Sequence, residues 1–169
     1  INFNSFTILL AIASMPLAFS YPLMKRYTYW PQLFLGITFN FGLLLGWSSY
    51  NESLSIIPII FYLGAIFWTL GYDTIYGFQD IEDDEIIGVK STSIKFKKNP
   101  KIFLTICYVL FITSLLISGK LLNLNLYYYV GILFISMHLF MYQIFKFDKK
   151  NKIEFLNIFK SNNILGLMV

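Results

Sequence analysis

Long apolar segments, separated by short polar stretches, dominate the sequence. A helix needs about 20 predominantly apolar residues to cross the hydrocarbon core of a membrane. Five segments approach that length and predict complete spans: residues 6–23, 33–49, 54–72, 102–118 and 124–145. We expect the first span to break near Met15 and Pro16. A short apolar run at the end of the chain predicts a sixth, truncated span, which a basic linker over residues 146–160 precedes.

The composition supports the same class of protein. Apolar residues make up 57% of the chain and charged residues 13%, whereas soluble proteins average about 25% charged residues. We therefore expect an all-α, polytopic transmembrane helical bundle that forms one membrane domain over residues 1–169. The lipid bilayer is its expected partner, and no nucleic acid is expected. The chain begins with Ile1 and ends within an apolar run, which indicates part of a longer protein.

Positive charge is concentrated on one side of the predicted topology. Twelve of the 13 lysines and arginines fall in the loops that follow the first, third and fifth spans, and only Lys120 falls on the other side. Loops rich in lysine and arginine stay on the cytoplasmic side of a membrane. This distribution predicts a cytoplasmic position for those three loops.

Acidic residues are concentrated in residues 72–92, where the third span ends. If the helix continues to a cap at Gly88, Asp80 and Asp84 lie within about 20° of Asp73 around its axis. Such a row of carboxylates raises the pKa of each member unless a cation binds among them, and hard oxygen ligands suit Mg²⁺. A solvated helix end without a metal is the alternative, although an ionisable residue inside a span favours a functional site.

Basic and aromatic residues near the same membrane boundary suit an anionic ligand. Lys90 directly follows the acidic cluster, and Tyr21 and Lys25 share a helix face. These residues could orient a diphosphate, or they could be interfacial residues with no ligand. Arg26 could bind a planar carboxylate through two parallel hydrogen bonds. His138 lies mid-span without an acidic partner in its segment, so a hydrogen-bonded structural role is expected.

Two stretches resemble a known family. YDTIYGFQDIEDDEIIGVKST, at residues 72–92, resembles the second aspartate-rich motif of the UbiA membrane prenyltransferases. YPLMKRYTYWPQLFLG, at residues 21–36, is similar to the stretch between the fourth and fifth helices of that family. Within the family, the first stretch is most similar to the 4-hydroxybenzoate polyprenyltransferase branch. The similarity in pattern extends over essentially the whole chain.

The resemblance implies an activity: Mg²⁺-dependent transfer of a polyprenyl group from polyprenyl diphosphate to the ring of 4-hydroxybenzoate, in ubiquinone biosynthesis. It also implies a location in a bacterial inner membrane with the acidic loop cytoplasmic. The expected catalytic residues are Asp73, Asp80 and Asp84, with Asp73 a candidate base for the ring proton. The expected metal ligands are Asp80, Asp83 and Asp84, and the expected substrate-binding residues are Tyr21, Lys25, Arg26 and Lys90.

One departure from the family pattern limits these expectations. UbiA members have nine spans and two aspartate-rich motifs, and the first motif is absent from this sequence. The chain would hold spans four to nine, with the last incomplete, and we expect it to be inactive without an N-terminal half. Other acceptors (naphthoate, haem, chlorophyllide), an ion-handling segment or a non-catalytic remnant stay open.

Overall fold

A computed structural model describes residues 3–148 and 152–168, and the regular structure in those ranges is entirely helical. Five helical segments in this described part are long and apolar enough to cross a membrane: Ser5–Tyr27, Pro31–Asn51, Ile56–Gly77, Pro100–Leu121 and Leu126–Ile144. This finding confirms the all-α, polytopic fold and the five complete spans. Lys149 and Lys150, which belong to the predicted basic linker, lie outside the described residues.

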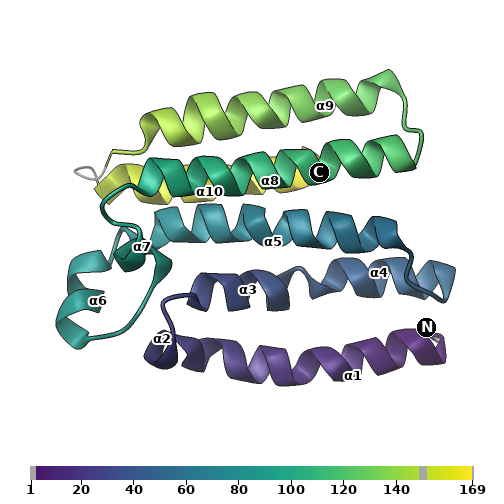
Figure 1. Ribbon diagram of the computed structural model, residues 1–169, viewed down its shortest axis with the longest axis horizontal. Coiled ribbons are helices and arrows are strands. Elements are labelled where there is room, and N and C mark those ends of the chain that lie inside the picture. The colour runs from purple at the N-terminus through teal and green to yellow at the C-terminus, as the bar shows by residue number, and fades with distance from the viewer. Residues whose placement is uncertain (1–2, 149–151, 169) are drawn as a thin grey trace.

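The helices follow one another with short connections (Figure 1). In chain order they are α1 (Ser5–Ser20), η1 (Tyr21–Leu23), α2 (Met24–Tyr27), α3 (Pro31–Phe39), α4 (Phe41–Asn51), α5 (Ile56–Gly77), α6 (Ile81–Ile87), α7 (Thr92–Lys95), α8 (Pro100–Leu121), α9 (Leu126–Met137), η2 (His138–Ile144) and α10 (Lys152–Met168).

Helix α5 is the centre of the bundle, because it packs against α8, α3 and α10. Its approach to α8 is closest at Gly64, where an added Cβ would lie 1.6 Å from Ser114 Oγ. The core between these helices contains Leu70, Phe111 and Leu115, each no more than 2% exposed. Cys107, a free cysteine, is buried as well.

The predicted break at Pro16 is wrong. Helix α1 continues through Pro16 to Ser20, and the change of conformation comes later, in the 3₁₀ turn that contains Pro22. The second span, in contrast, is divided between α3 and α4 at Asn40. The Asn40 amide donates to the Gly36 carbonyl and to Thr69 Oγ1, at 2.8 Å each, and so ties the junction to α5.

The predicted continuation of the third span to Gly88 is also wrong. Helix α5 ends at Gly77, and a short turn separates it from α6, so Asp73 does not share a continuous helix face with Asp80 and Asp84. Phe78 explains the turn, because its ring is buried 5.1 Å from the ring of Phe147 and draws the chain back to the bundle. Gly88 is a left-handed C-cap as expected, but it caps α6.

The predicted basic linker and truncated span need a correction as well. Residues from Lys152 onward, assigned to the linker, already form α10, which continues through the predicted span to Met168. Phe155, Ile158 and Leu165 recur at helical spacing and are each no more than 1% exposed. This buried stripe folds the segment against α5, although α10 is not among the five described helices that could cross a membrane.

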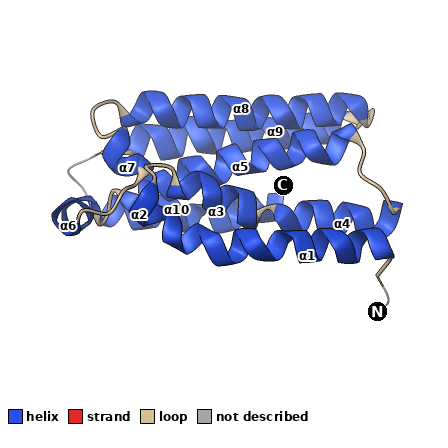
Figure 2. Cartoon of the chain, turned by 60° about the horizontal axis from the view of Figure 1, so that its bottom comes forward, coloured by secondary structure: helices blue, strands red, loops and turns tan. Residues whose placement is uncertain are grey.

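The elements that carry the predicted site lie at one end of the bundle. Helices α2, α6 and α7 and the start of α10 are together at the left of Figure 1, and the turned view of Figure 2 shows α2, α6 and α7 at the same end. The loops after the first, third and fifth spans therefore lie at one end, as alternating spans require.

Candidate functional site

A buried hydrogen-bond cluster fixes the loop after α6 to the end of α5. The Thr74 and Thr92 hydroxyl oxygens are 2.6 Å apart, and the Ser93 hydroxyl donates to the Thr74 carbonyl at 2.8 Å. From α3, Gln32 Oε1 accepts a hydrogen bond from the Thr92 N–H at 3.0 Å. Because buried polar groups without partners are costly, this cluster holds three helices in fixed positions beside Asp73.

Lys90 connects the acidic stretch to α2. Its backbone N–H donates to the Lys25 carbonyl at 2.8 Å, and its Nζ donates to the Tyr27 carbonyl at 3.2 Å. These contacts bring together two predicted substrate-binding residues that are far apart in sequence. Arg26 is exposed in the same short helix as Lys25.

A small cavity lies between α2, α3 and the end of α5. Its volume is about 70 Å³, and its lining includes Tyr21, Lys25, Gln32 and Asp73. Three residues that the sequence predicted for the site thus face one space, a cation opposite a carboxylate. Since a water molecule takes up about 30 Å³ of the liquid, the cavity can accept a small polar group but not a whole diphosphate.

The carboxylates of α6 lie close enough to this cavity to interact with its lysine. Asp80 occupies the N-cap position, and Asp83 and Asp84 lie in the first turn. Burial raises the pKa of Asp84, the positive charge of Lys25 opposes that rise, and the negative charges of Asp80 and Asp83 add to it. Lys25 therefore acts electrostatically on Asp84 and also lines the cavity with Asp73.

Ion pairs divide the acidic residues into two groups. Glu82 pairs with Lys152 at 2.9 Å, and Glu85 pairs with Lys97. Asp80, Asp83 and Asp84 form no salt bridge to any described residue. Asp80, Asp83 and Asp84, which the sequence predicted as metal ligands, thus form no direct ion pair with a described lysine or arginine, and the same holds for Asp73.

The carboxylates fit a metal site that the protein shares with a bound substrate better than one that the protein forms alone. Within the described ranges, no three His, Cys, Asp or Glu side chains are grouped so that they could hold a metal ion. Mg²⁺ is usually held by one or two carboxylates together with substrate phosphates. The aspartates of α6 fit that arrangement.

A second cavity, of about 430 Å³, lies deeper in the bundle between α3, α5 and α10. Its walls include Trp68, Tyr72 and Phe159, and Asn40 contributes an amide. Tyr72 directly precedes Asp73 in α5, and each residue lines a different cavity. The sequence alone did not identify its lining, because aromatic residues occur throughout the spans.

His138 does not contribute to either cavity. Its Nε2 lies 2.9 Å from Ser161 Oγ, which confirms the expected hydrogen-bonded histidine.

Comparison with known proteins gives a consistent result. The sequence profile of the UbiA prenyltransferase family matches residues 1–164. The chain is 42% identical over 171 residues to 4-hydroxybenzoate geranyltransferase 2 of Lithospermum erythrorhizon. It is 40% identical over 169 residues to the mitochondrial 4-hydroxybenzoate polyprenyltransferase of Dictyostelium discoideum, and 39% identical over 170 residues to that of Rattus norvegicus.

The alignments cover 98–100% of this chain but only 36%, 55% and 45% of the Dictyostelium, Lithospermum and rat proteins. The chain thus spans between about a third and about half of their lengths. No solved structure gives a significant match.

Proposed function

Because the chain belongs to the UbiA prenyltransferase family, we propose that the protein transfers a polyprenyl group from polyprenyl diphosphate to the ring of 4-hydroxybenzoate, in ubiquinone biosynthesis. The relatives named above act on 4-hydroxybenzoate by name and align with nearly the whole chain. The observation that carries the proposal is that Tyr21, Lys25 and Asp73 line one cavity. The positive charge of Lys25 also opposes the rise in the pKa of Asp84.

In this proposal the acidic helix and the lysines bind the diphosphate. One or two of Asp80, Asp83 and Asp84, together with diphosphate oxygens, would hold Mg²⁺, which would neutralise the charge that develops on a leaving diphosphate. Lys25 and Lys90 add positive charge on the α2 side, and Tyr21 orients a phosphate oxygen by hydrogen bonding. The ion pairs of Glu82 and Glu85 leave these two carboxylates in a structural role.

The deeper aromatic cavity suits the apolar part of the reaction. Trp68, Tyr72 and Phe159 line a space that borders two of the candidate membrane spans, where we expect little water to reach an allylic cation and quench it. We propose that the acceptor ring and the first isoprene units occupy this space. Asp73, which follows Tyr72, accepts the displaced ring proton, and Arg26 binds the benzoate carboxylate.

The protein is an integral membrane protein, since five helices of its described part are long and apolar enough to cross a membrane. The relatives from Dictyostelium and rat are mitochondrial by name, and this finding does not support the expected bacterial inner membrane. Loops rich in lysine and arginine stay on the side of the membrane from which the protein is inserted. We propose that the end with α2 and α6 lies on that side, because most of the lysines are there. We also propose that the first aspartate-rich motif of the family, supplied from outside these 169 residues, completes the Mg²⁺ site.

Product analysis tests the proposal. The full-length protein, in membranes with Mg²⁺ and a polyprenyl diphosphate, should prenylate 4-hydroxybenzoate in preference to naphthoate, haem or chlorophyllide acceptors. Chelation of Mg²⁺ should abolish the product. If a different acceptor is prenylated and 4-hydroxybenzoate is not, the proposed acceptor is wrong. The proposal of prenyl transfer would still stand.

A further inference from the structure

A third cavity lies outside the candidate site, at the same end of the bundle but on the α8 side. It is a cleft of about 570 Å³ between the start of α8 and the residues that follow η2. Its lining shares no residue with the two cavities described above. The cleft therefore needs an explanation of its own.

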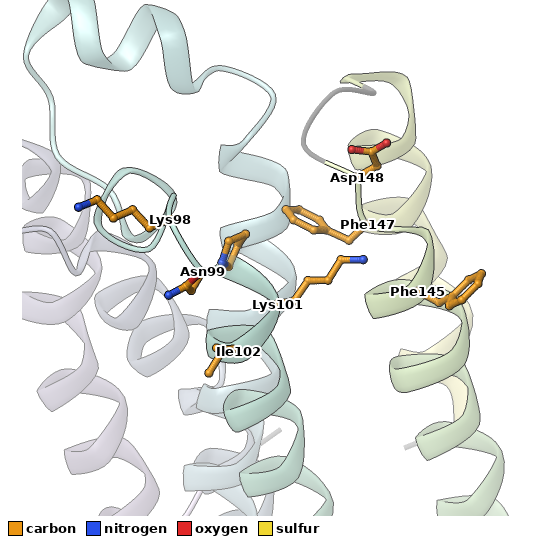
Figure 3. Close-up of a pocket in the computed structure, with 8 residues that line it drawn as sticks. Lys98, Asn99, Lys101, Ile102, Phe145, Phe147 and Asp148 are labelled. Atoms are coloured by element: carbon orange, nitrogen blue, oxygen red, sulfur yellow. The ribbon is translucent and has the colours of Figure 1, made fainter.

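The cleft combines charge at its mouth with apolar walls. Figure 3 shows Lys101 projecting from α8 into the gap in front of η2, with Asp148 above it. Lys98 and Asn99 lie on the other side of the α8 start in the same view. Phe147, which is 1% exposed, closes the floor.

The apolar walls continue from the cleft along both helices. Ile102 is 62% exposed and Phe145 is 81% exposed. Residues four apart share a helix face, so Ile106 lies beyond Ile102 on α8 and Met141 of η2 lies beyond Phe145. Both side chains are also exposed. A ligand in the cleft thus meets a cation at the membrane boundary and bare hydrocarbon surface below it.

This order of groups matches a phospholipid. Basic pockets between membrane helices bind the headgroups of anionic lipids. Lys101 forms no salt bridge with a described residue, so its ammonium group can bind a phosphate. A free phosphate would use the lysine but leave the exposed walls at Ile102 and Phe145 without a role.

We propose that this cleft binds an anionic phospholipid of the surrounding bilayer, with its phosphate on Lys101 and its acyl chains along Ile102 and Phe145. The site does not depend on the transfer reaction, and its occupant is a structural lipid rather than a substrate. Asp148 opposes the negative headgroup and weakens binding.

Native mass spectrometry tests the headgroup. The full-length protein is extracted from vesicles of phosphatidylglycerol and phosphatidylcholine in equal amounts, and the bound lipids are counted. Phosphatidylglycerol should be retained in preference. Lys101→Gln should lower its occupancy about fivefold, the effect of one lysine near a membrane surface, and Lys101→Arg should retain it.

Lys120→Gln is the matched control, because it removes a lysine from the opposite end of the same helix. An equal loss with Lys120→Gln, or no loss with Lys101→Gln, would overturn the proposal. Asp148→Asn should raise phosphatidylglycerol occupancy. A fall would instead indicate a zwitterionic headgroup whose ammonium binds Asp148, and would refute the anionic assignment.

A second pair of variants tests the acyl chains. Phe145→Ala should lower lipid retention, whereas Phe134→Ala, another exposed phenylalanine outside the cleft, should leave it unchanged. Displacement of the lipid by millimolar inorganic phosphate would show a site for the free anion and would exclude the lipid.

Discussion

Individual carboxylates of the acidic stretch differ in their surroundings, and that difference separates their roles. Asp80 and Asp84 form no salt bridge to a described residue, whereas Glu82, two positions from each, is paired with Lys152. A negative charge that is already paired contributes little to a metal site. The electrostatic effect of Lys25 on Asp84 further ties this helix to the cavity that Asp73 lines.

Neutral replacements should therefore have unequal effects. Asp80→Asn and Asp84→Asn should each lower prenyl transfer by about 100-fold or more, since charge stabilisation of a leaving group commonly supplies several kcal/mol. Glu82→Gln should matter much less. The rate of product formation by the full-length protein in membranes is the measurement, and equal mild losses at all three positions would favour a solvated acidic surface.

The sequence selected the candidate site residues but not the contacts that hold them in place. Asp73, Lys25 and Tyr21 could be selected because charge near a membrane boundary is conspicuous against an apolar background. Gln32 and Thr92 could not, because an isolated amide or hydroxyl gives no sign in the sequence that it bonds across helices. Their hydrogen bond depends on the packing of α3 against α7, which only the structure shows.

At the scale of elements, the contact between α5 and α8 depends on the absence of a side chain at Gly64. Helices in membranes associate through close packing, for which small residues are required. At Gly64 an added Cβ would lie 2.5 Å from the Cβ of Ser114, an atom that no rotamer change can move away. The two helices would have to separate.

Gly64→Ala should therefore destabilise the protein by about 1–3 kcal/mol, the usual cost of overpacking. Gly42→Ala is the matched control, because nothing lies within 4 Å of a Cβ added there. Thermal unfolding in detergent, followed by circular dichroism, compares the two variants. Equal midpoints would show that the α5–α8 contact can relax at no cost.

The helices could be predicted from the sequence where the length of an apolar segment determines them. Apolar segments of about 17 to 22 residues predicted the five spans. The turn after Gly77 was not predicted, because Phe78 leaves the helix to pack on Phe147. Helix α10 was partly missed for a related reason. Its lysines are typical of a linker. The apolar stripe through Phe155 and Ile158 could not be recognised as buried until its packing against α5 was seen.

For the whole molecule, the two ends should face opposite compartments. Single cysteines at positions 25, 84 and 146 should react with an impermeant thiol reagent from one side of the membrane, and those at 52 and 120 from the other. Cys107 is 1% exposed and should not react. Labelling of position 84 from the same side as position 120 would contradict the topology.

Residues 1–169 alone should not catalyse the reaction. Near-octahedral Mg²⁺ needs several oxygens in fixed places, and the described residues offer no group of three potential ligands. A chain of residues 1–169 should give no prenylated 4-hydroxybenzoate and no thermal shift with Mg²⁺ and a polyprenyl diphosphate.

Co-expression with a segment that carries the first aspartate-rich motif provides the converse experiment. Preformed membrane helices can reassemble from separate chains, so turnover and the Mg²⁺-dependent thermal shift should return together. The same segment with its motif aspartates changed to asparagine should restore the thermal stability of the bundle but not turnover. Robust transfer by residues 1–169 alone would refute the two-motif account, because one acidic helix would then suffice to hold the metal and the diphosphate.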